Sequence, residues 1–146
     1  MRDKTILLVE DNADDSTLAQ RALKRVGMVS CLVIARDGSE ALDYLFESEN
    51  RESKRLLPAV VILDLSLPKI TGFEVLERVR ADDRTRTLPV VVLSSSAIEG
   101  DIERSYQLGA NSYVQKPVAS ADFRDAVQQI GSYWFKLNET SAGKSH

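Results

Sequence analysis

Residues 60–68 read VVILDLSLP, an apolar run with three β-branched residues that leads directly into a lone aspartate, Asp64. A proline, Pro68, follows four residues later. Such a run is typical of a strand buried on both faces of a parallel sheet. Asp64 then has two interpretations: it begins a turn or caps the next helix, or it is a reactive carboxylate at the end of a strand.

Short apolar runs alternate with longer amphipathic segments along the whole chain. The predicted strands are Thr5–Val9, Cys31–Ala35, Ala59–Leu63, Pro89–Leu93 and Ser112–Val114. Each is followed by a segment with apolar residues at helical spacing, which in the last helix are Phe123, Val127, Ile130 and Trp134. Five strands alternating with five helices predict a doubly wound α/β domain.

Composition excludes several classes of protein. The chain has 146 residues and 43% hydrophobic residues, which fits one domain with a proper core. A net charge of −3 argues against direct nucleic-acid binding. Cys31 is the only cysteine, so an internal disulfide is excluded, and we expect an inert core thiol in a reducing compartment. Without a signal peptide or an apolar run of about 18 residues, we expect a cytoplasmic protein that does not enter a membrane.

The domain is expected to span residues 1–137, followed by a flexible polar tail, NETSAGKSH, at residues 138–146. Glu47–Arg55 is a polar insertion before the third strand and is interpreted as a solvated loop. We find no repeat and no second domain in this sequence, and therefore expect the domain to act on another molecule.

Acidic residues follow two of the strands. Glu10 and Asp11 end the first strand and Asp64 ends the third. Ligands bind at the carboxyl ends of the strands in an open parallel sheet, so three carboxylates are expected in one small volume. A divalent cation such as Mg²⁺ would offset their repulsion. Taken alone, the first pair is equally well interpreted as the start of a helix, because Asp14 and Asp15 follow.

Other polar groups follow the remaining strands at the same edge. The fourth strand leads into the hydroxyls of Ser94–Ser96, and the fifth leads into Lys116. A lysine offers a cationic contact to a transferred phosphoryl group, and a serine can donate a hydrogen bond to it. The backbone carbonyl of Ser66, in the turn after Asp64, is the best-placed additional metal ligand. Each signal is weak alone, but their combination predicts a phosphoryl-transfer site.

Four segments together resemble the receiver domain of two-component response regulators. They are ILLVEDN (6–12), VVILDLSLPKITG (60–72), PVVVLSSS (89–96) and GANSYVQKP (109–117), and the likeness extends over about residues 4–135. The resemblance implies a flavodoxin-like (βα)5 fold with a five-stranded parallel sheet of order 2-1-3-4-5. It also implies a regulator that accepts a phosphoryl group from a sensor histidine kinase and catalyses only its own phosphorylation and dephosphorylation.

The resemblance also assigns roles to residues of this chain. It implies a phosphoacceptor at Asp64 and a Mg²⁺ or Mn²⁺ ion bound by Glu10, Asp11, Asp64 and the Ser66 carbonyl. The implied switch and phosphoryl contacts are Ser94, Tyr113 and Lys116. The position of Ser94 is more often threonine in the family, so a methyl group is lost and the switch is expected to couple less tightly.

Within the family, the chain is most similar to single-domain receivers that partner bacterial and cyanobacterial phytochromes. The segments VEDNADD (9–15), ARDGSEALDYLF (35–46), RSYQLGANSYVQKP (104–117) and SYWF (132–135) carry this likeness. It implies a phytochrome kinase as partner and a homodimer through the fourth helix, fifth strand and last helix with its C-terminal end. At 100° per residue, Tyr133 and Phe135 fall outside the core stripe of that helix, which makes them predicted contact residues. The alternative is that they are scattered surface aromatics.

Other functions fit less well. An aspartate-nucleophile phosphatase of the haloacid dehalogenase type needs a second carboxylate two residues after the nucleophile, where this chain has Ser66. A flavin carrier needs a phosphate-binding first loop, which EDNADD (10–15) would repel. A histidine phosphotransfer protein is excluded because the only histidine is His146. A relay intermediate and a phosphate sink stay open as roles for a receiver.

Overall fold

The computed structural model describes residues 5–27, 32–46, 57–96 and 98–138 of the chain. Cys31, the insertion Glu47–Arg55 and residues 139–146 of the predicted tail lie outside these ranges. The expectations for them therefore stay predictions.

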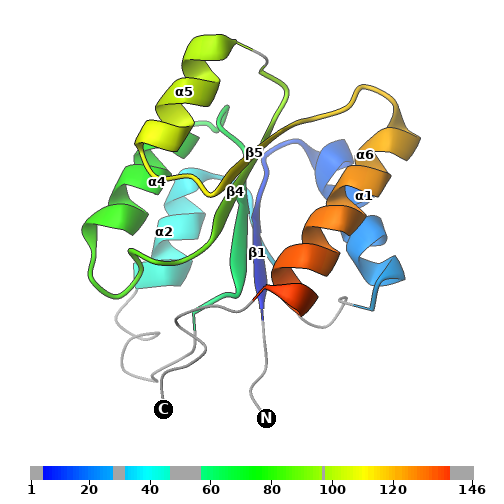
Figure 1. Ribbon diagram of the computed structural model, residues 1–146, viewed down its shortest axis with the longest axis horizontal. Helices are drawn as coiled ribbons and strands as arrows, with labels where there is room; N and C mark the ends of the chain where they lie inside the picture. Colours follow the sequence, from blue (N-terminus) through cyan, green and yellow to red (C-terminus); the bar gives the residue numbers. More distant parts are fainter. Residues whose placement is uncertain (1–4, 28–31, 47–56, 97, 139–146) are drawn as a thin grey trace.

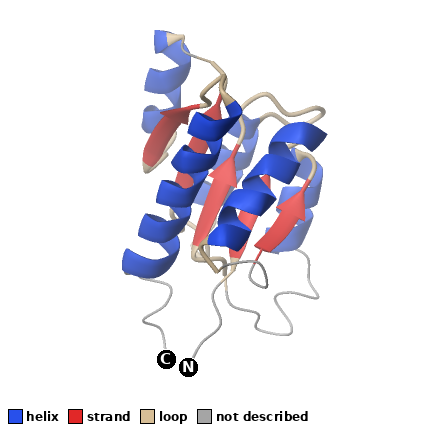
Figure 2. Cartoon of the chain, turned by 90° about the vertical axis from the view of Figure 1, so that its right-hand side faces the viewer, coloured by secondary structure: helices blue, strands red, loops and turns tan. Residues whose placement is uncertain are grey.

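Five parallel strands form one sheet, as predicted. They are β1 (Ile6–Val9), β2 (Leu32–Ala35), β3 (Val60–Leu63), β4 (Val90–Ser94) and β5 (Ser112–Gln115). Their order is β2-β1-β3-β4-β5, which confirms the expected flavodoxin-like topology. All strands run the same way, so their carboxyl ends meet at one edge of the sheet (Figure 2).

Helices cover both faces of the sheet (Figure 1). One face carries α1 (Ala13–Arg25) and α6 (Ser120–Gly131), which continues into η2 (Ser132–Leu137). The other carries α2 (Gly38–Phe46), α4 (Gly72–Ala81) and α5 (Glu99–Gln107). No described helix is long and apolar enough to cross a lipid bilayer.

The continuous apolar strands are explained by this arrangement. In β1, Leu7 and Val9 belong to the core under α2 and α4, whereas Ile6 and Leu8 belong to the core under α1 and α6. Successive side chains of a strand point to opposite faces, so both must be apolar when both faces are covered.

The end of the last helix differs from the prediction. Tyr133 is exposed as expected, but Phe135 is partly buried and packs with Trp134 against the core on the α1 and α6 side. The prediction assumed an α-helix, whereas Ser132–Leu137 forms a π-helix. A π-helical turn holds more residues than an α-helical one, so each residue rotates less and Phe135 stays near the core. Phe135 is therefore a packing residue here.

Candidate phosphoryl-transfer site

Strand register brings the first two acidic residues together. Val9 of β1 pairs with Leu63 of β3, so the next residues, Glu10 and Asp64, leave the sheet side by side. Both are almost fully buried, with 3% and 5% of their surface exposed, whereas the neighbouring Asp11 is exposed. Carboxylate oxygens of these three residues all lie within 4.8 Å of one another. The predicted convergence of carboxylates is thus present.

The loop after β1 is held by short-range hydrogen bonds. The Asn12 N–H donates to Glu10 Oε2 at 3.1 Å, and the Asn12 side chain caps α1 by accepting from the Asp15 N–H at 2.9 Å. These bonds fix the path from β1 into α1, and with it the orientation of the Glu10 carboxylate.

Asp64 is held between a backbone amide and a lysine. Its Oδ1 accepts the Ser66 N–H at 3.2 Å, and its Oδ2 accepts Lys116 Nζ at 3.2 Å. Close packing against the start of α4 fixes its backbone, because a Cβ at Gly72 would overlap the Asp64 carbonyl oxygen. The helix itself is started by a reciprocal capping box between Thr71 and Glu74.

Lys116 supplies the positively charged side chain of the site. Its Nζ lies 2.8 Å from Glu10 Oε1, 3.0 Å from Asp15 Oδ2 and 3.2 Å from Asp64 Oδ2. Asp15 was not predicted as a site residue. The sequence does contain a signal for it: Asp15 lies four residues before Ala19 and seven before Ala22, so it is on the same buried face of α1 as these two alanines.

Burial and charge shape the protonation of this cluster. The pKa of Glu10 is raised to about 7, mainly because the carboxyl group is buried. The hydrogen bond from Lys116 lowers this pKa, and the negative charge of Asp64 raises it. Burial alone would lower the pKa of Lys116, but hydrogen bonds to Glu10 and Asp15 and the charge of Asp64 raise it above its ordinary value. Lys116 therefore stays charged, yet one ammonium leaves the crowded carboxylates incompletely compensated.

The carboxylates fit a divalent cation. Glu10, Asp11 and Asp64 supply hard oxygen ligands, which Mg²⁺ and Mn²⁺ prefer. Asp11 is exposed, and a hollow of about 590 Å³ begins at Glu10 and Asp11 and extends along α1 to Ile34 and Arg36. The cation site expected from the sequence thus has its carboxylates in place.

Among the described residues, no side-chain hydrogen bond joins either predicted switch residue, Ser94 or Tyr113, to the carboxylates of this cluster. Ser94 ends β4 and is fully buried; its Oγ accepts the Ser96 N–H at 3.3 Å, and its carbonyl accepts the Lys116 N–H at 2.7 Å. Tyr113 of β5 is half-buried and donates its hydroxyl to the Ser96 carbonyl at 2.8 Å. Its backbone N–H donates to the Tyr106 hydroxyl at 3.1 Å. Ser94 and Tyr113 are therefore connected through one residue, Ser96.

This geometry agrees with comparisons to known proteins. The profile of the response regulator receiver domain matches residues 6–128. The chain belongs to this family. The resemblance inferred from the four sequence segments is thereby confirmed, and a response regulator receiver domain is not a classical enzyme. Membership in a two-component system implies a histidine kinase as partner.

Relatives match over nearly their whole length. The response regulator Rcp1 of Synechocystis is 39% identical over 133 residues, which cover 91% of this chain and 90% of Rcp1. The probable methanogenesis regulatory protein FilR2 of Methanothrix harundinacea is 42% identical over 135 residues, covering 92% and 86%.

Solved structures support the same family and the narrower likeness. The phosphorylated cyanobacterial phytochrome response regulator RcpA has a TM-score of 0.87 and 37% identity, and the match covers 96% of this chain and 99% of RcpA. The Mn²⁺-bound form of Rcp1 has a TM-score of 0.83 and 37% identity, covering 94% and 98%. The chain is thus related to phytochrome response regulators, as the sequence segments indicated.

Proposed function

We propose that Asp64 accepts a phosphoryl group from a phosphohistidine of a sensor histidine kinase. An Asp64 carboxylate oxygen forms the new bond to phosphorus, the phosphorus–nitrogen bond breaks, and its electron pair stays with the leaving imidazole. The observation that carries this proposal is the position of Asp64: buried at a strand end, with Lys116 Nζ at 3.2 Å and two further carboxylates within 4.8 Å.

In this proposal Glu10, Asp11, Asp64 and the Ser66 carbonyl hold Mg²⁺ or Mn²⁺. When bound, the cation neutralises charge on the phosphoryl oxygens. The carboxylate cluster and the Mn²⁺-bound form of the related Rcp1 support this assignment. Lys116 contacts one remaining phosphoryl oxygen and Ser94 donates a hydrogen bond to another. Ser94 ends β4 and Lys116 follows β5, at the same edge of the sheet as Asp64.

Intact-mass spectrometry tests the proposal. Wild type incubated with acetyl phosphate and Mg²⁺ should gain one phosphoryl group, and Asp64→Asn should gain none. Addition of a chelator should abolish labelling of wild type. Equal labelling of the two proteins, or labelling that the chelator does not change, would refute the assignment.

Phosphorylation is proposed to change the surface of α5, β5 and α6. Ser94 moves toward the phosphoryl group, and Tyr113 fills the space beside it. The connection of both residues to Ser96 supports this route, because movement of the Ser94–Ser96 loop must alter the acceptor of the Tyr113 hydroxyl.

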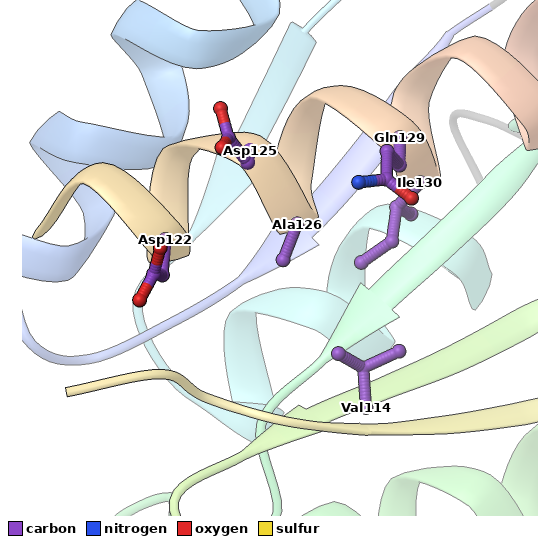
Figure 3. A pocket seen from close by; sticks show the side chains of 6 residues that line it. All are labelled: Val114, Asp122, Asp125, Ala126, Gln129 and Ile130. Carbon is purple, nitrogen blue, oxygen red and sulfur yellow. The ribbon is translucent and has the colours of Figure 1, made fainter. Parts of the chain in front are cut away.

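The same surface is proposed to form a homodimer. Among the described residues, the exposed large hydrophobic side chains are Ile98, Tyr106, Val118 and Tyr133. They lie in or beside α5, between β5 and α6, and in η2. A hollow of about 400 Å³ lies between β5 and α6. In Figure 3, Ala126 and Ile130 of α6 point toward Val114 of β5. The exposed apolar side chains of this surface, together with Val114, Ala126 and Ile130 in a hollow that Asp122, Asp125 and Gln129 also line, favour contact with a second copy.

Sedimentation equilibrium tests the dimer. Wild type should associate at tens of micromolar, and Tyr133→Ala should weaken this association. A monomeric wild type, with and without phosphorylation, would exclude the dimer.

The kinase is proposed to be a phytochrome kinase. Likeness to RcpA supports this choice, whereas FilR2 bears the name of a different process. Phosphotransfer from phytochrome kinases should be faster than transfer from unrelated kinases; equal rates would contradict the pairing. Back-transfer to a histidine phosphotransfer protein would instead favour a relay intermediate, and transfer without any change at Tyr113 would favour a phosphate sink.

A further inference from the structure

The Lys116 ammonium binds one carboxylate that lies outside the cation cluster. Its partners are Glu10, Asp64 and Asp15, the last at 3.0 Å. Glu10 and Asp64 belong to the group of carboxylates that fits a cation, whereas Asp15 does not. Asp15 comes from the first turn of α1, and Lys116 follows β5, so the pair joins two segments 101 residues apart in sequence.

Asp15 is held in position by its own backbone. Its N–H donates to Asn12 Oδ1 at 2.9 Å, and the Asn12 N–H in turn donates to Glu10 Oε2 at 3.1 Å. The first turn of α1 is therefore tied to the same cluster that Lys116 enters. The Asp15 side chain keeps 30% of its surface exposed, compared with 3% for Glu10.

An ammonium has three N–H donors, and the three carboxylates use all of them. In the proposed function, oxygens of Glu10 and Asp64 bind the cation, and an oxygen of Asp64 binds the phosphoryl group. Asp15 is the partner that can keep its bond to Lys116 throughout.

We propose that Asp15 is a positioning residue, which holds the Lys116 ammonium beside Asp64 so that it is ready to meet a phosphoryl oxygen. The catalytic consequence, though not the positioning itself, rests on the proposed function of Lys116. Without Asp15, the Lys116 ammonium has only Glu10 and Asp64 as carboxylate partners, and it competes with the cation for the oxygens of these two residues.

A simpler role for Asp15 is to place negative charge at the amino end of α1, where it interacts favourably with the helix dipole. Asp14 has the same charge in the same turn but is exposed, and no ion pair joins it to Lys116 in the described part of the chain. Asp14→Ala therefore removes the helix-end charge and preserves the lysine contact. It is the matched control for Asp15→Ala.

The first measurement needs neither cation nor phosphoryl donor. In ¹⁵N NMR spectra of lysine-labelled protein, the Lys116 ammonium should give a protected N–H signal, identified by its loss in Lys116→Ala. We expect Asp15→Ala to accelerate exchange of these protons with water by about tenfold, as loss of a charge-assisted hydrogen bond requires, and Asp14→Ala to leave it within about twofold. Equal exchange in wild type and Asp15→Ala would overturn the proposal.

The second measurement is the rate of phosphorylation by acetyl phosphate at saturating Mg²⁺. Asp15→Ala should lower the maximal rate about fivefold, a moderate effect because the pair is partly exposed, and Asp14→Ala less than twofold. In a Lys116→Ala background, Asp15→Ala should have no further effect. An equal loss in both backgrounds would refute action through Lys116. Absence of phosphorylation in wild type would refute the proposed function, while the NMR result would still decide whether Asp15 positions Lys116.

Discussion

Gly72 offers the sharpest test of how the fold fixes the phosphoacceptor. It is the first residue of α4, and its N–H donates to the Leu65 carbonyl at 3.0 Å. A Cβ at this position would overlap the Asp64 carbonyl oxygen and lie 2.7 Å from Leu65 Cα, well inside the 3.4 Å at which ordinary contact begins. The obstacles are backbone atoms next to the nucleophile, so relief requires α4 or the end of β3 to move.

The cost of Gly72→Ala follows from this geometry. Overpacking of a close-packed site costs about 1–3 kcal/mol, and we expect about 3 kcal/mol here because backbone has to shift. This lowers the folding equilibrium constant by about two orders of magnitude. With a urea dependence of about 2 kcal/mol per molar, the unfolding midpoint should fall by about 1.5 M. Displacement of Asp64 should also slow phosphorylation, by up to about 100-fold for a shift of about 1 Å.

Gly100→Ala is the matched control. Gly100 lies in α5, and in the described part of the chain no atom beyond its sequence neighbours and its own helix backbone lies within 4 Å of a Cβ built there. Alanine stabilises a helix relative to glycine by roughly 0.5–1 kcal/mol, so this variant should be as stable as wild type or slightly more stable. Urea unfolding measures both variants. A Gly72→Ala protein with the midpoint and phosphorylation rate of wild type would refute the proposed close contact between α4 and Asp64.

Four further substitutions test other parts of the structure. Ser94→Ala should still be phosphorylated but lose more than half of the phosphorylation-dependent NMR shift at Tyr113; a full shift would contradict the switch. Arg80→Lys should lose about 1–2 kcal/mol of unfolding free energy, because lysine cannot reproduce the guanidinium contacts with the carbonyls at positions 88 and 109; unchanged thermal unfolding would argue against this clamp. Phe135→Ala should lower the free energy of unfolding by about 2 kcal/mol, which is less than for a fully buried phenylalanine. Tyr133→Ala should lower it by less than about 0.5 kcal/mol, as is usual for a surface substitution. Equal losses would place both aromatics in the same environment.

Much of the fold could be predicted from the sequence. The strands are continuous apolar runs, and their predicted ends are correct to within one residue wherever the structure describes them. Thr5, Ala59 and Pro89 were predicted as first strand residues but precede their strands, and β4 and β5 continue one residue further than predicted. The strand order came from the family resemblance. Periodicity alone does not specify which strands are neighbours.

The acidic cluster was predictable because parallel strands end at a common edge. The contact between Asp15 and Lys116 was not, because it depends on how the first turn of α1 sits against the segment after β5. Phe135 was misplaced for a local reason: a single π-helical turn changes which residues share a face, and neither propensity nor spacing signals it.

The central claim is that Asp64 is the phosphoacceptor, and trapping of the acyl phosphate tests it most directly. Borohydride reduces a phosphorylated aspartate to homoserine, and peptide mass spectrometry then locates the modified position. After incubation with acetyl phosphate and Mg²⁺, homoserine should appear at Asp64 and at no other carboxylate of the cluster. Homoserine at Asp11 or Asp15, or none at Asp64 in a protein that has gained a phosphoryl group, would contradict the account.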